Sequence, residues 1–368
     1  MKHDWEWRSF EACLEKVIYT KKLQSSDYLS EGKYPIVSQE EGLISGYWDN
    51  DDDVFRITKP IVIFGDHTRV LKYIDFNFVL GADGVKILQP IDDIRAKFLY
   101  YYLKWFNVPS LGYSRHYKLL KECSVPVPAL AVQERIVGEL DKVREIIEKK
   151  KEQLKELDNL AQSIFYDMFG DPVENEKGWE VKTFGEVGEL IRGGGFLKSD
   201  FVESGVPCIH YGQIHMKFGQ FIKEHLTEIP ASVAAKSKIA SKGDVVIAIT
   251  SEDVEGSCKC TAWMGDYDIF VGAHAAIYKH NQNPIYVSYY IKSSGFQIAK
   301  QKYVHGIKVM EIKPSDISKI DILLPPLSLQ QAFAEKIEVI EKQKELITAS
   351  IKEAERLFDS RMEYWFGE

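Results

Sequence analysis

An internal repeat dominates this sequence. Residues 128–170 align without a gap with residues 325–367, and ten of the 43 aligned positions are identical. About two or three identities would be expected by chance at ordinary composition. The identities include both ends of the segment, with a proline at the first position and Phe-Gly at the last. We therefore expect the two segments to adopt the same structure.

Apolar residues recur in both segments at alternating steps of four and three, which is the spacing of a coiled-coil seam. This spacing predicts two long helices that pair. The residues predicted to pair them are Ile136, Leu140, Val143, Ile147, Leu154, Leu157, Phe333, Ile337, Ile340, Ile347, Ile351 and Phe358, and the same spacing continues to Ile164, Met168, Arg361 and Trp365. Each seam also contains a lysine, Lys150 or Lys344, that aligns with an isoleucine of the other copy. Such an offset is typical of register control between two specific helices. The alternative is that each helix packs only on its own globular domain.

The repeat extends to the stretches that precede the two helices. Both contain a mostly apolar strand signal, at residues 60–64 and 244–249, and a later amphipathic helix signal, at residues 96–106 and 286–300. Both end in prolines, and because proline disfavours helix in the residue before it, the long helices are expected to start after them.

These patterns predict an α+β fold in which two similar mixed α/β domains alternate with two long helices. The domains are predicted over residues 1–128 and 171–327, and the helices over residues 129–170 and 328–368. A chain that leaves one domain along the first helix and returns from the other along the second must run the two helices antiparallel if they pair. The predicted arrangement therefore has approximate two-fold symmetry.

Composition excludes some classes of protein. The net charge of −8, from 47 basic and 55 acidic residues, argues against a polycation that coats nucleic acid, so DNA binding would need local patches or a more basic partner. The five cysteines form no disulfide framework, and Cys258 and Cys260 lack a second pair or a histidine at zinc spacing. No signal peptide and no apolar run of about 18 residues is visible, which predicts a cytoplasmic protein without a membrane span.

Motifs for catalysis are scarce. No phosphate-binding loop of the Gly-x-x-x-x-Gly-Lys-Ser/Thr type occurs, which argues against ATP hydrolysis by this chain. The segment 283–286, Asn-Pro-Ile-Tyr, differs from the tetrapeptide of amino-methyltransferases at its third residue and is interpreted as a turn before a helix. Residues 193–195 are three glycines, which are interpreted as a flexible loop or turn; the alternative is a segment whose backbone approaches a phosphate. Residues 50–53, Asn-Asp-Asp-Asp, are interpreted as a solvated turn and not a metal site.

The order of domains and helices, together with two local motifs, resembles the specificity subunit of Type I restriction-modification systems. The motifs are the similar helix starts Pro128-Ala-Leu-Ala-Val-Gln133-Glu134 and Pro325-Pro-Leu-Ser-Leu-Gln330-Gln331, and the run Phe64-Gly-Asp-His-Thr-Arg-Val70. The resemblance covers essentially the whole chain. It implies that each globular unit is a target recognition domain that reads one half of a bipartite DNA site.

The resemblance also implies partners and cofactors. The helices would space the recognition domains and hold DNA methyltransferase subunits, two in number, to which restriction and translocation subunits add. S-adenosylmethionine, ATP and magnesium would then be bound by those partners, and this chain would be a non-catalytic subunit with no cofactor and no metal. Independently of the resemblance, two tethered domains that are similar but not identical suit two unlike half-sites, and the helix length would set the gap between them.

Candidate DNA contacts follow from residue chemistry. Arginine suits guanine or phosphate, glutamine suits adenine, and histidine suits phosphate. In the first domain the predicted contacts are His67, Thr68, Arg69, Tyr113, Ser114, Arg115, His116 and Lys118. In the second domain they are Arg192, Lys198, His210, Tyr211, Gln213, His215, Lys217, His305 and Lys308. The alternative for the cluster at residues 113–118 is a solvated loop with its aromatic rings in the core. The alternative for each single histidine is a structural role, because lone histidines are more often structural groups than ligand contacts.

Two other functions stay open on the sequence alone. One is a self-contained DNA-modifying enzyme, a nuclease or methyltransferase with a degenerate site. The other is a coiled-coil scaffold whose end domains bind proteins. Methyl transfer or cleavage by the purified chain would favour the first, and sequence-specific DNA binding would argue against the second.

Overall fold

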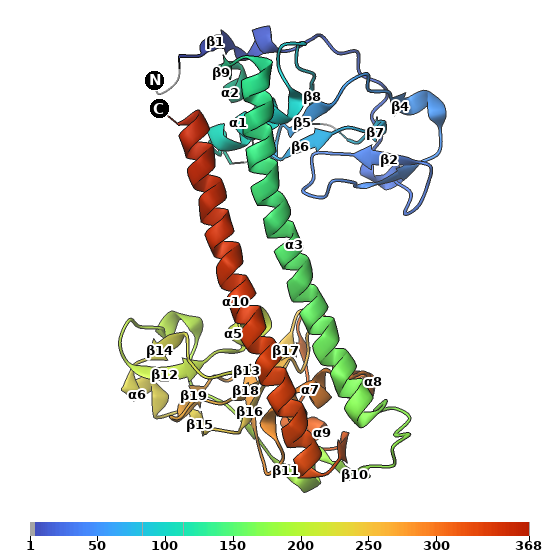
Figure 1. Ribbon diagram of the computed structural model, residues 1–368. Helices are drawn as coiled ribbons and strands as arrows, with labels where there is room; N and C mark the ends of the chain where they lie inside the picture. Colours follow the sequence, from blue (N-terminus) through green and yellow to red (C-terminus); the bar gives the residue numbers. More distant parts are fainter. Residues whose placement is uncertain (1–3, 83, 113, 368) are drawn as a thin grey trace. The chain divides into compact units, whose positions relative to one another are not determined.

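The computed structural model describes residues 4–82, 84–112 and 114–367, and it divides into two compact units. Unit 1 comprises residues 1–152 and 348–368, and unit 2 comprises residues 153–347. Two long helices, α3 (Leu130–Phe169) and α10 (Leu327–Phe366), each contribute one part to each unit (Figure 1). The division into units thus cuts both helices, and the domain boundaries predicted at residues 128, 170 and 327 stay predictions.

The two long helices are copies of each other in length and position. Each has 40 residues, and both the starts (327 − 130) and the ends (366 − 169) lie 197 residues apart. The repeat in the sequence is therefore a repeat in the structure. A glycine follows the last residue of both helices. The N–H of Gly170 donates to the carbonyl of Tyr166, and that of Gly367 donates to the carbonyl of Glu363.

The helices pair antiparallel within each unit, as predicted. In unit 1, Glu139 forms an ion pair with Arg361, and the guanidinium of Arg135 lies 5.2 Å from the ring centroid of Trp365, so rising numbers on α3 meet falling numbers on α10. In unit 2, Asp158 lies 2.8 Å from Nζ of Lys344. The alternative in which each helix packs only on its own domain is therefore wrong.

Most of the predicted seam is buried, but its ends differ. The buried seam residues are Ile136, Leu140, Val143, Ile147, Phe333, Ile337, Ile340, Ile351 and Phe358, whereas Leu154, Leu157 and Ile347 are half-buried. At the C-terminal ends the expected Ile164, Met168 and Arg361 are less buried than Phe165, Phe169, Met362 and Phe366. The pattern changes to steps of four there because the helix ends pack on the globular part of a unit.

Unit 1 builds its globular part from three small sheets. The strands are β1 (Glu6–Ser9), β2 (Tyr34–Val37), β3 (Gly46–Trp48), β4 (Val54–Phe55), β5 (Ile61–Gly65), β6 (Leu71–Ile74), β7 (Phe78–Leu80), β8 (Val85–Leu88) and β9 (Ser124–Val127). The sheet orders are β3-β2-β7-β4, β6-β5-β8 and β1-β9. Helix α1 (Ala96–Phe106) follows β8, and the short helix α2 (Tyr117–Lys121) precedes β9. The structure confirms the helix predicted over residues 96–106.

Unit 2 uses the same plan with additions. Its strands are β10 (Glu180–Thr183), β11 (Gly188–Arg192), β12 (Val206–Ile209), β13 (Phe221–Ile222), β14 (Thr227–Ile229), β15 (Lys238–Ala240), β16 (Val245–Ala248), β17 (Thr250–Ser251), β18 (Cys260–Trp263), β19 (Ile269–Val271), β20 (Ala275–His280), β21 (Met310–Glu311) and β22 (Asp321–Leu324). Its short helices are α4 (Phe184–Val187), α5 (Tyr211–Met216), α6 (Ala231–Ala234), α7 (Pro284–Lys292), α8 (Ser294–Lys300) and α9 (Pro314–Ile317). The sheet orders are β11-β20-β16-β18-β13, β14-β12-β19-β15, β10-β22 and β17-β21.

Strand pairing shows how the two units correspond. The antiparallel ribbon β1-β9 matches β10-β22, and both lie next to the start of a long helix. The parallel pair β2-β7 matches β12-β19. The antiparallel trio β6-β5-β8 matches β18-β16-β20. Two similar mixed α/β domains are therefore present, as predicted.

One predicted helix is two helices. Residues 286–300 were expected to be continuous, but α7 ends at Lys292 and α8 begins at Ser294. Ser293 between them has extended backbone, with φ −68° and ψ 158°, and its hydroxyl donates to the carbonyl of Tyr290. Serine competes in this way for backbone groups that a continuing helix would use, which explains the break.

A buried glutamine at the start of each long helix explains one of the repeated identities. Gln133 and Gln330 are fully buried, and their Oε1 atoms accept the N–H of Arg95 at 2.8 Å and of Asn283 at 2.9 Å, the residues that precede α1 and α7. Their Nε2 atoms donate at 2.8 Å to the carbonyls of the repeated prolines, Pro128 and Pro325. The side chain thus joins the long helix to the shorter helix of its domain.

Replacing Gln133 by Ala is therefore expected to lower the free energy of unfolding of unit 1 by about 2–4 kcal/mol, because buried backbone donors and acceptors lose their partner. Gln330→Ala is expected to affect unit 2 in the same way. Urea denaturation measures both, with Gln153→Ala, at an exposed position of α3, as the control. Losses below about 1 kcal/mol for both buried glutamines would contradict this role.

The enclosed imidazole of His280 gives unit 2 a pH dependence. Nδ1 of His280 accepts the N–H of Gln282, and Nε2 is buried without a partner among the described residues. Burial lowers the pKa of His280 to about 4, although the negative charge of Asp244 acts to raise it. The unfolded value is about 6.5. The folded state therefore disfavours the protonated ring, so the stability of unit 2 is fully present above about pH 6.5 and declines toward pH 4, by about 3 kcal/mol in total. Urea denaturation across this range should show the decline, and His280→Asn should reduce it.

The described residues contain neither a helix that is long and apolar enough for a membrane span nor a cluster of three or more His, Cys, Asp or Glu side chains able to hold a metal ion. All five cysteines are free and buried. The run at residues 50–53 forms a hydrogen-bonded turn, in which Asn50 caps the N–H of Asp52 and Asp53 accepts from the indole of Trp48.

Candidate nucleic-acid interface

In unit 1 the structure brings together the two segments in which DNA contacts were predicted. The turn after β5 contains Asp66, and His116 and Tyr117 lie beside it. The main-chain N–H of His116 donates to the carbonyl of Asp66 at 2.8 Å, and Nδ1 of His116 lies 3.0 Å from the same oxygen. The carboxylate of Asp66 accepts the N–H of Tyr117 at 2.8 Å. The two segments therefore form one surface.

His116 itself is not part of that surface, and its prediction as a DNA contact is wrong. The residue is fully buried, and its Nε2 accepts the N–H of Leu111 at 3.0 Å while Nδ1 donates to Asp66. Because both ring nitrogens bond to the main chain, the ring carries its proton on Nδ1 and acts as a brace between the two segments.

Arg69 also braces these segments. It has a left-handed backbone conformation, with φ 62°, and its Nη1 donates to the carbonyl of Val108 at 3.0 Å. The N–H of His67 and the hydroxyl of Thr68 both bond to Gln39, on the loop that follows β2. Of the predicted residues in this domain, Thr68, Arg115 and Lys118 are exposed, and His67, Arg69 and Ser114 are half-buried. Tyr113 lies outside the described residues.

In unit 2 the predicted contacts around α5 form a row of rings. The ring centroid of Tyr211 lies 4.5 Å from that of His210, 6.0 Å from that of His215 and 5.0 Å from that of His274. Nε2 of His215 lies 2.9 Å from the carbonyl of Thr250, which fixes the row to strand β17. His274, which follows β19, was not predicted from the sequence, because a single histidine after a strand carries no periodic signal.

His210 and Gln213 act as caps of α5. Nδ1 of His210 accepts the N–H of Gly212, and burial lowers the pKa of His210, helped by the nearby charges of His274 and Lys198. Oε1 of Gln213 accepts the N–H of His210 at 2.9 Å, and its Nε2 donates to the hydroxyl of Thr227 at 3.0 Å. Both ends of this amide are therefore occupied within the chain, and the prediction that Gln213 reads adenine stays a prediction.

The remaining predicted residues of unit 2 lie in three places. Arg192 donates to the carbonyl of Ala273 and forms an ion pair of 2.9 Å with Glu311. Glu311 pairs through its main chain with His305 across an exposed loop that contains Lys308 and the almost fully exposed Ile307. Lys198 is exposed near His210. Lys217 instead lines a separate hollow, which Glu338, Glu341 and Glu345 of α10 also line.

A hollow of about 810 Å³ lies against the row of rings. Its walls include the rings of Tyr211, His215 and His274, residues 250–253, Glu255, Gly256 and Lys259, and Val309 from the exposed loop. The segment 251–256 was not predicted as part of a site. It carries the carboxylates Glu252, Asp253 and Glu255, which accept hydrogen bonds and suit the amino groups of cytosine or adenine more than phosphate.

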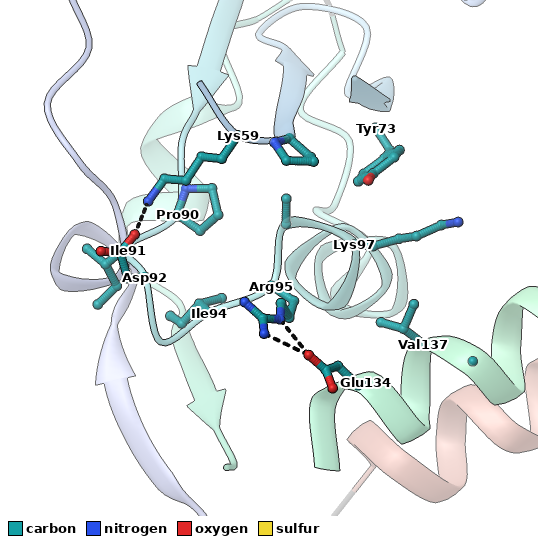
Figure 2. Close-up of a pocket in the computed structure, with 13 residues that line it drawn as sticks. Lys59, Tyr73, Pro90, Ile91, Asp92, Ile94, Arg95, Lys97, Glu134 and Val137 are labelled. Atoms are coloured by element: carbon teal, nitrogen blue, oxygen red, sulfur yellow. Dashed lines mark hydrogen bonds and ion pairs between the residues drawn. The ribbon is translucent and has the colours of Figure 1, made fainter. Parts of the chain in front are cut away.

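A second hollow, of about 370 Å³ in unit 1, is unsuited to phosphate. It lies where α1 and α3 begin (Figure 2). Its cations are paired with carboxylates: Lys59 with Asp92 at 2.7 Å, Arg95 with Glu134 at 2.7 Å, and Lys97 with Asp141 at 2.7 Å. The charges compensate within the hollow, so it offers no excess of positive charge to DNA.

Comparisons with known proteins agree with this architecture. The family model described as "Type I restriction modification DNA specificity domain" matches twice, at residues 3–158 and 176–356. The specificity subunit of the Escherichia coli enzyme EcoR124I/EcoR124II is 23% identical over 363 residues, which cover 93% of this chain and 88% of the relative. The MjaVIII specificity subunit of Methanocaldococcus jannaschii is 23% identical over 396 residues, covering 96% of this chain and 89% of the relative.

Solved structures share the fold. The S subunit of a Type I restriction-modification system from M. genitalium aligns with a TM-score of 0.53 and 14% identity, over 98% of this chain and 95% of that one. A chain from a structure of a Type I restriction-modification complex aligns with a TM-score of 0.56 and 16% identity, over 98% and 97%. The two matches to the family model span most of this chain, and the relatives and solved structures agree with them. The chain therefore belongs to the Type I restriction-modification DNA specificity family.

Proposed function

We propose that this chain recognises a bipartite DNA sequence, each globular unit reading one half of it. The observation that carries the proposal is that one architecture occurs twice and presents different side chains in its two copies. Unit 1 presents the cations Arg115 and Lys118 beside the turn after β5. Unit 2 presents the row of rings around Tyr211 and a longer acidic segment after β16. Different donors and acceptors on a shared framework suit two unlike half-sites.

The proposal includes methyltransferase subunits docked on the long helices. Five identities of the repeat lie on the exposed face of each helix, away from the seam: Glu148, Lys155, Glu156, Leu160 and Ser163 on α3, and Glu345, Lys352, Glu353, Leu357 and Ser360 on α10. Leu160 is 47% exposed and Leu357 51% exposed. Packing within the chain does not require identical residues at exposed positions. Two copies of one partner, each bound to one of these faces, would require them.

Catalysis is assigned to partners. In this proposal S-adenosylmethionine belongs to the methyltransferase subunits, and ATP and magnesium belong to restriction and translocation subunits. This chain contributes sequence recognition and spacing only. The competing proposal of a self-contained enzyme requires methyl transfer or cleavage by the purified chain alone, which we expect to be absent.

The proposal is tested by mapping N6-methyladenine across the genome of cells that express this chain with its neighbouring methyltransferase. A bipartite motif is expected, and it should vanish when this chain alone is deleted. Arg115→Ala is expected to reduce methylation about tenfold, because one cation at a base or phosphate contributes on the order of 1–3 kcal/mol. Lys16→Ala, at another exposed cation of unit 1, is the control. Methylation that persists without the chain would refute the proposal.

A further inference from the structure

Among the described residues, each unit contains one deeply buried lysine. Lys72, on β6, is 5% exposed, and Lys300, at the end of α8, is 1% exposed. The ammonium group of Lys72 donates to the carbonyl of Ser38 at 2.9 Å and to that of Gly42. The ammonium group of Lys300 donates to the carbonyl of Glu255 at 3.0 Å and to that of Ser257. Within the described ranges, neither lysine forms an ion pair with a carboxylate. Both positive charges are therefore held by main-chain oxygens.

A buried ammonium without a close counter-ion is costly. Removal of a charge from water costs several kcal/mol, and buried charges are usually paired for this reason. Burial lowers the pKa of Lys72 and of Lys300, opposed by more distant carboxylates that include Glu40 for the first and Asp253 and Glu255 for the second. An apolar side chain of similar length would avoid this cost. What the charge adds is the fixed position of four carbonyl groups.

In unit 1 those carbonyls belong to the loop that supports the predicted recognition turn. Ser38 and Gly42 flank Gln39, and Gln39 receives the N–H of His67 and the hydroxyl of Thr68. Lys72 thus fixes the loop from which the turn after β5 is held. The same loop exposes Leu43 and Ile44.

In unit 2 the carbonyls belong to the acidic segment that lines the 810 Å³ hollow. Glu255 and Ser257 stand in the loop between β17 and β18, and Glu255 lines the hollow together with Tyr211, His215 and His274. Lys300 therefore fixes the end of the segment whose Glu252 and Asp253 line the same hollow as the row of rings.

The two lysines do not correspond in the repeat. Lys72 pairs across β5-β6 with Ile63, and the matching position across β16-β18, opposite Ile247, is Cys260. Lys300 stands on α8 instead. The same device, a buried ammonium that holds the carbonyls of a loop beside the candidate interface, is thus present in each unit at an unrelated position.

We propose that Lys72 and Lys300 are positioning residues for sequence discrimination, each fixing one loop that supports or carries base-reading groups, so that loss of either ammonium relaxes recognition of one half of the DNA site only. This inference rests on the proposed function. The loops concerned are residues 38–45 for Lys72 and residues 251–257 for Lys300. Discrimination depends on fixed geometry, because a reading group displaced by about 1 Å no longer distinguishes base edges.

The test replaces each lysine by methionine, which keeps the long stem and removes the charge, in the full chain expressed with its neighbouring methyltransferase. N6-methyladenine mapping then measures the ratio of methylation at matched sites to that at sites with one mismatch. Lys300→Met is expected to lower this ratio about tenfold for mismatches in one half-site and to leave the other half unchanged, and Lys72→Met should do the reverse. Lys302→Met and Lys16→Met, at exposed lysines of the same units, should change neither ratio.

A second readout separates loop positioning from general stability. Hydrogen exchange of the purified Lys300→Met chain should quicken in residues 251–257, while the amides of β16 and β20 stay protected. Lys300→Gln, which keeps N–H donors, should restore part of the discrimination. Unchanged ratios, or equal relaxation of both halves, would overturn the inference, and so would the failure of both the methionine and the glutamine variants to fold. Absence of any bipartite motif with the unaltered chain would instead refute the proposed function.

Discussion

Phe169→Ala is expected to lower the free energy of unfolding of unit 2 by about 3–5 kcal/mol, the largest effect on stability that a single substitution in the helix ends should have. Phe169 is 1% exposed at the last position of α3. Its ring centroid lies 4.7 Å from that of Tyr286, 5.1 Å from that of Phe165 and 5.2 Å from that of Phe333. Truncation would leave a cavity enclosed by rigid aromatic rings, which cannot collapse to fill it.

The repeat supplies a matched experiment. Phe366 is the aligned residue on α10 and is 4% exposed. It packs in unit 1, where its ring centroid lies 5.6 Å from that of Phe98 and 5.7 Å from that of Tyr102. Phe366→Ala should therefore destabilise unit 1 and spare unit 2. Urea denaturation followed by hydrogen exchange in each unit measures the two effects separately. Equal destabilisation of both units by either variant would contradict this division.

Leu160→Asp combined with Leu357→Asp is expected to abolish methylation by the complex without unfolding this chain. Each leucine is exposed, so an aspartate at either position should cost the fold little. If each face binds one methyltransferase subunit, a carboxylate placed at the centre of that contact costs about 2 kcal/mol or more, or at least about thirtyfold in affinity. Either single substitution should remove one of two bound subunits.

Native mass spectrometry of the chain with its neighbouring methyltransferase measures this stoichiometry. Ile146→Asp and Leu346→Asp are matched controls. Each replaces an exposed apolar residue of a long helix, and the aligned residue in the other copy is polar: Gln343 for Ile146 and Lys149 for Leu346. The controls should retain two subunits. Retention of both subunits by the double variant would refute docking on the repeated faces, and equal losses in the controls would remove the argument from the repeat.

The long helices could be predicted from the sequence because two independent signals agree on them. The repeat fixed their length, and the seam spacing fixed the face that pairs. At the end of α3, Phe165 and Phe169 are buried in place of the predicted Ile164 and Met168. A seven-residue period could not predict this, because the buried face depends on what each helix end packs against. Likewise, the break at Ser293 depends on a hydroxyl whose choice of partner is set by the folded backbone.

The candidate interface was predicted less completely, for physical reasons. The contact between His116 and Asp66 joins residues 50 positions apart, and no local pattern reports it. Gln213 is different, because its place three residues after His210, at the start of a helix, is a capping pattern that was available in the sequence. His274, Gln39 and the acidic segment after β16 become relevant only through their neighbours, so they could be found only in the folded chain.

The order along the chain of the segments that form the two units has a consequence for biosynthesis. Unit 2 is one continuous stretch, residues 153–347, whereas unit 1 combines residues 1–152 with residues 348–368. On the ribosome, unit 2 therefore has all of its residues before unit 1 does, although unit 1 starts first. Until residues 348–368 emerge, Phe98, Tyr101 and Tyr102 lack the rings of Phe358 and Phe366 that cover them. A nascent chain is thus exposed to chaperones and proteases at this aromatic surface, and only a chain translated through α10 conceals it.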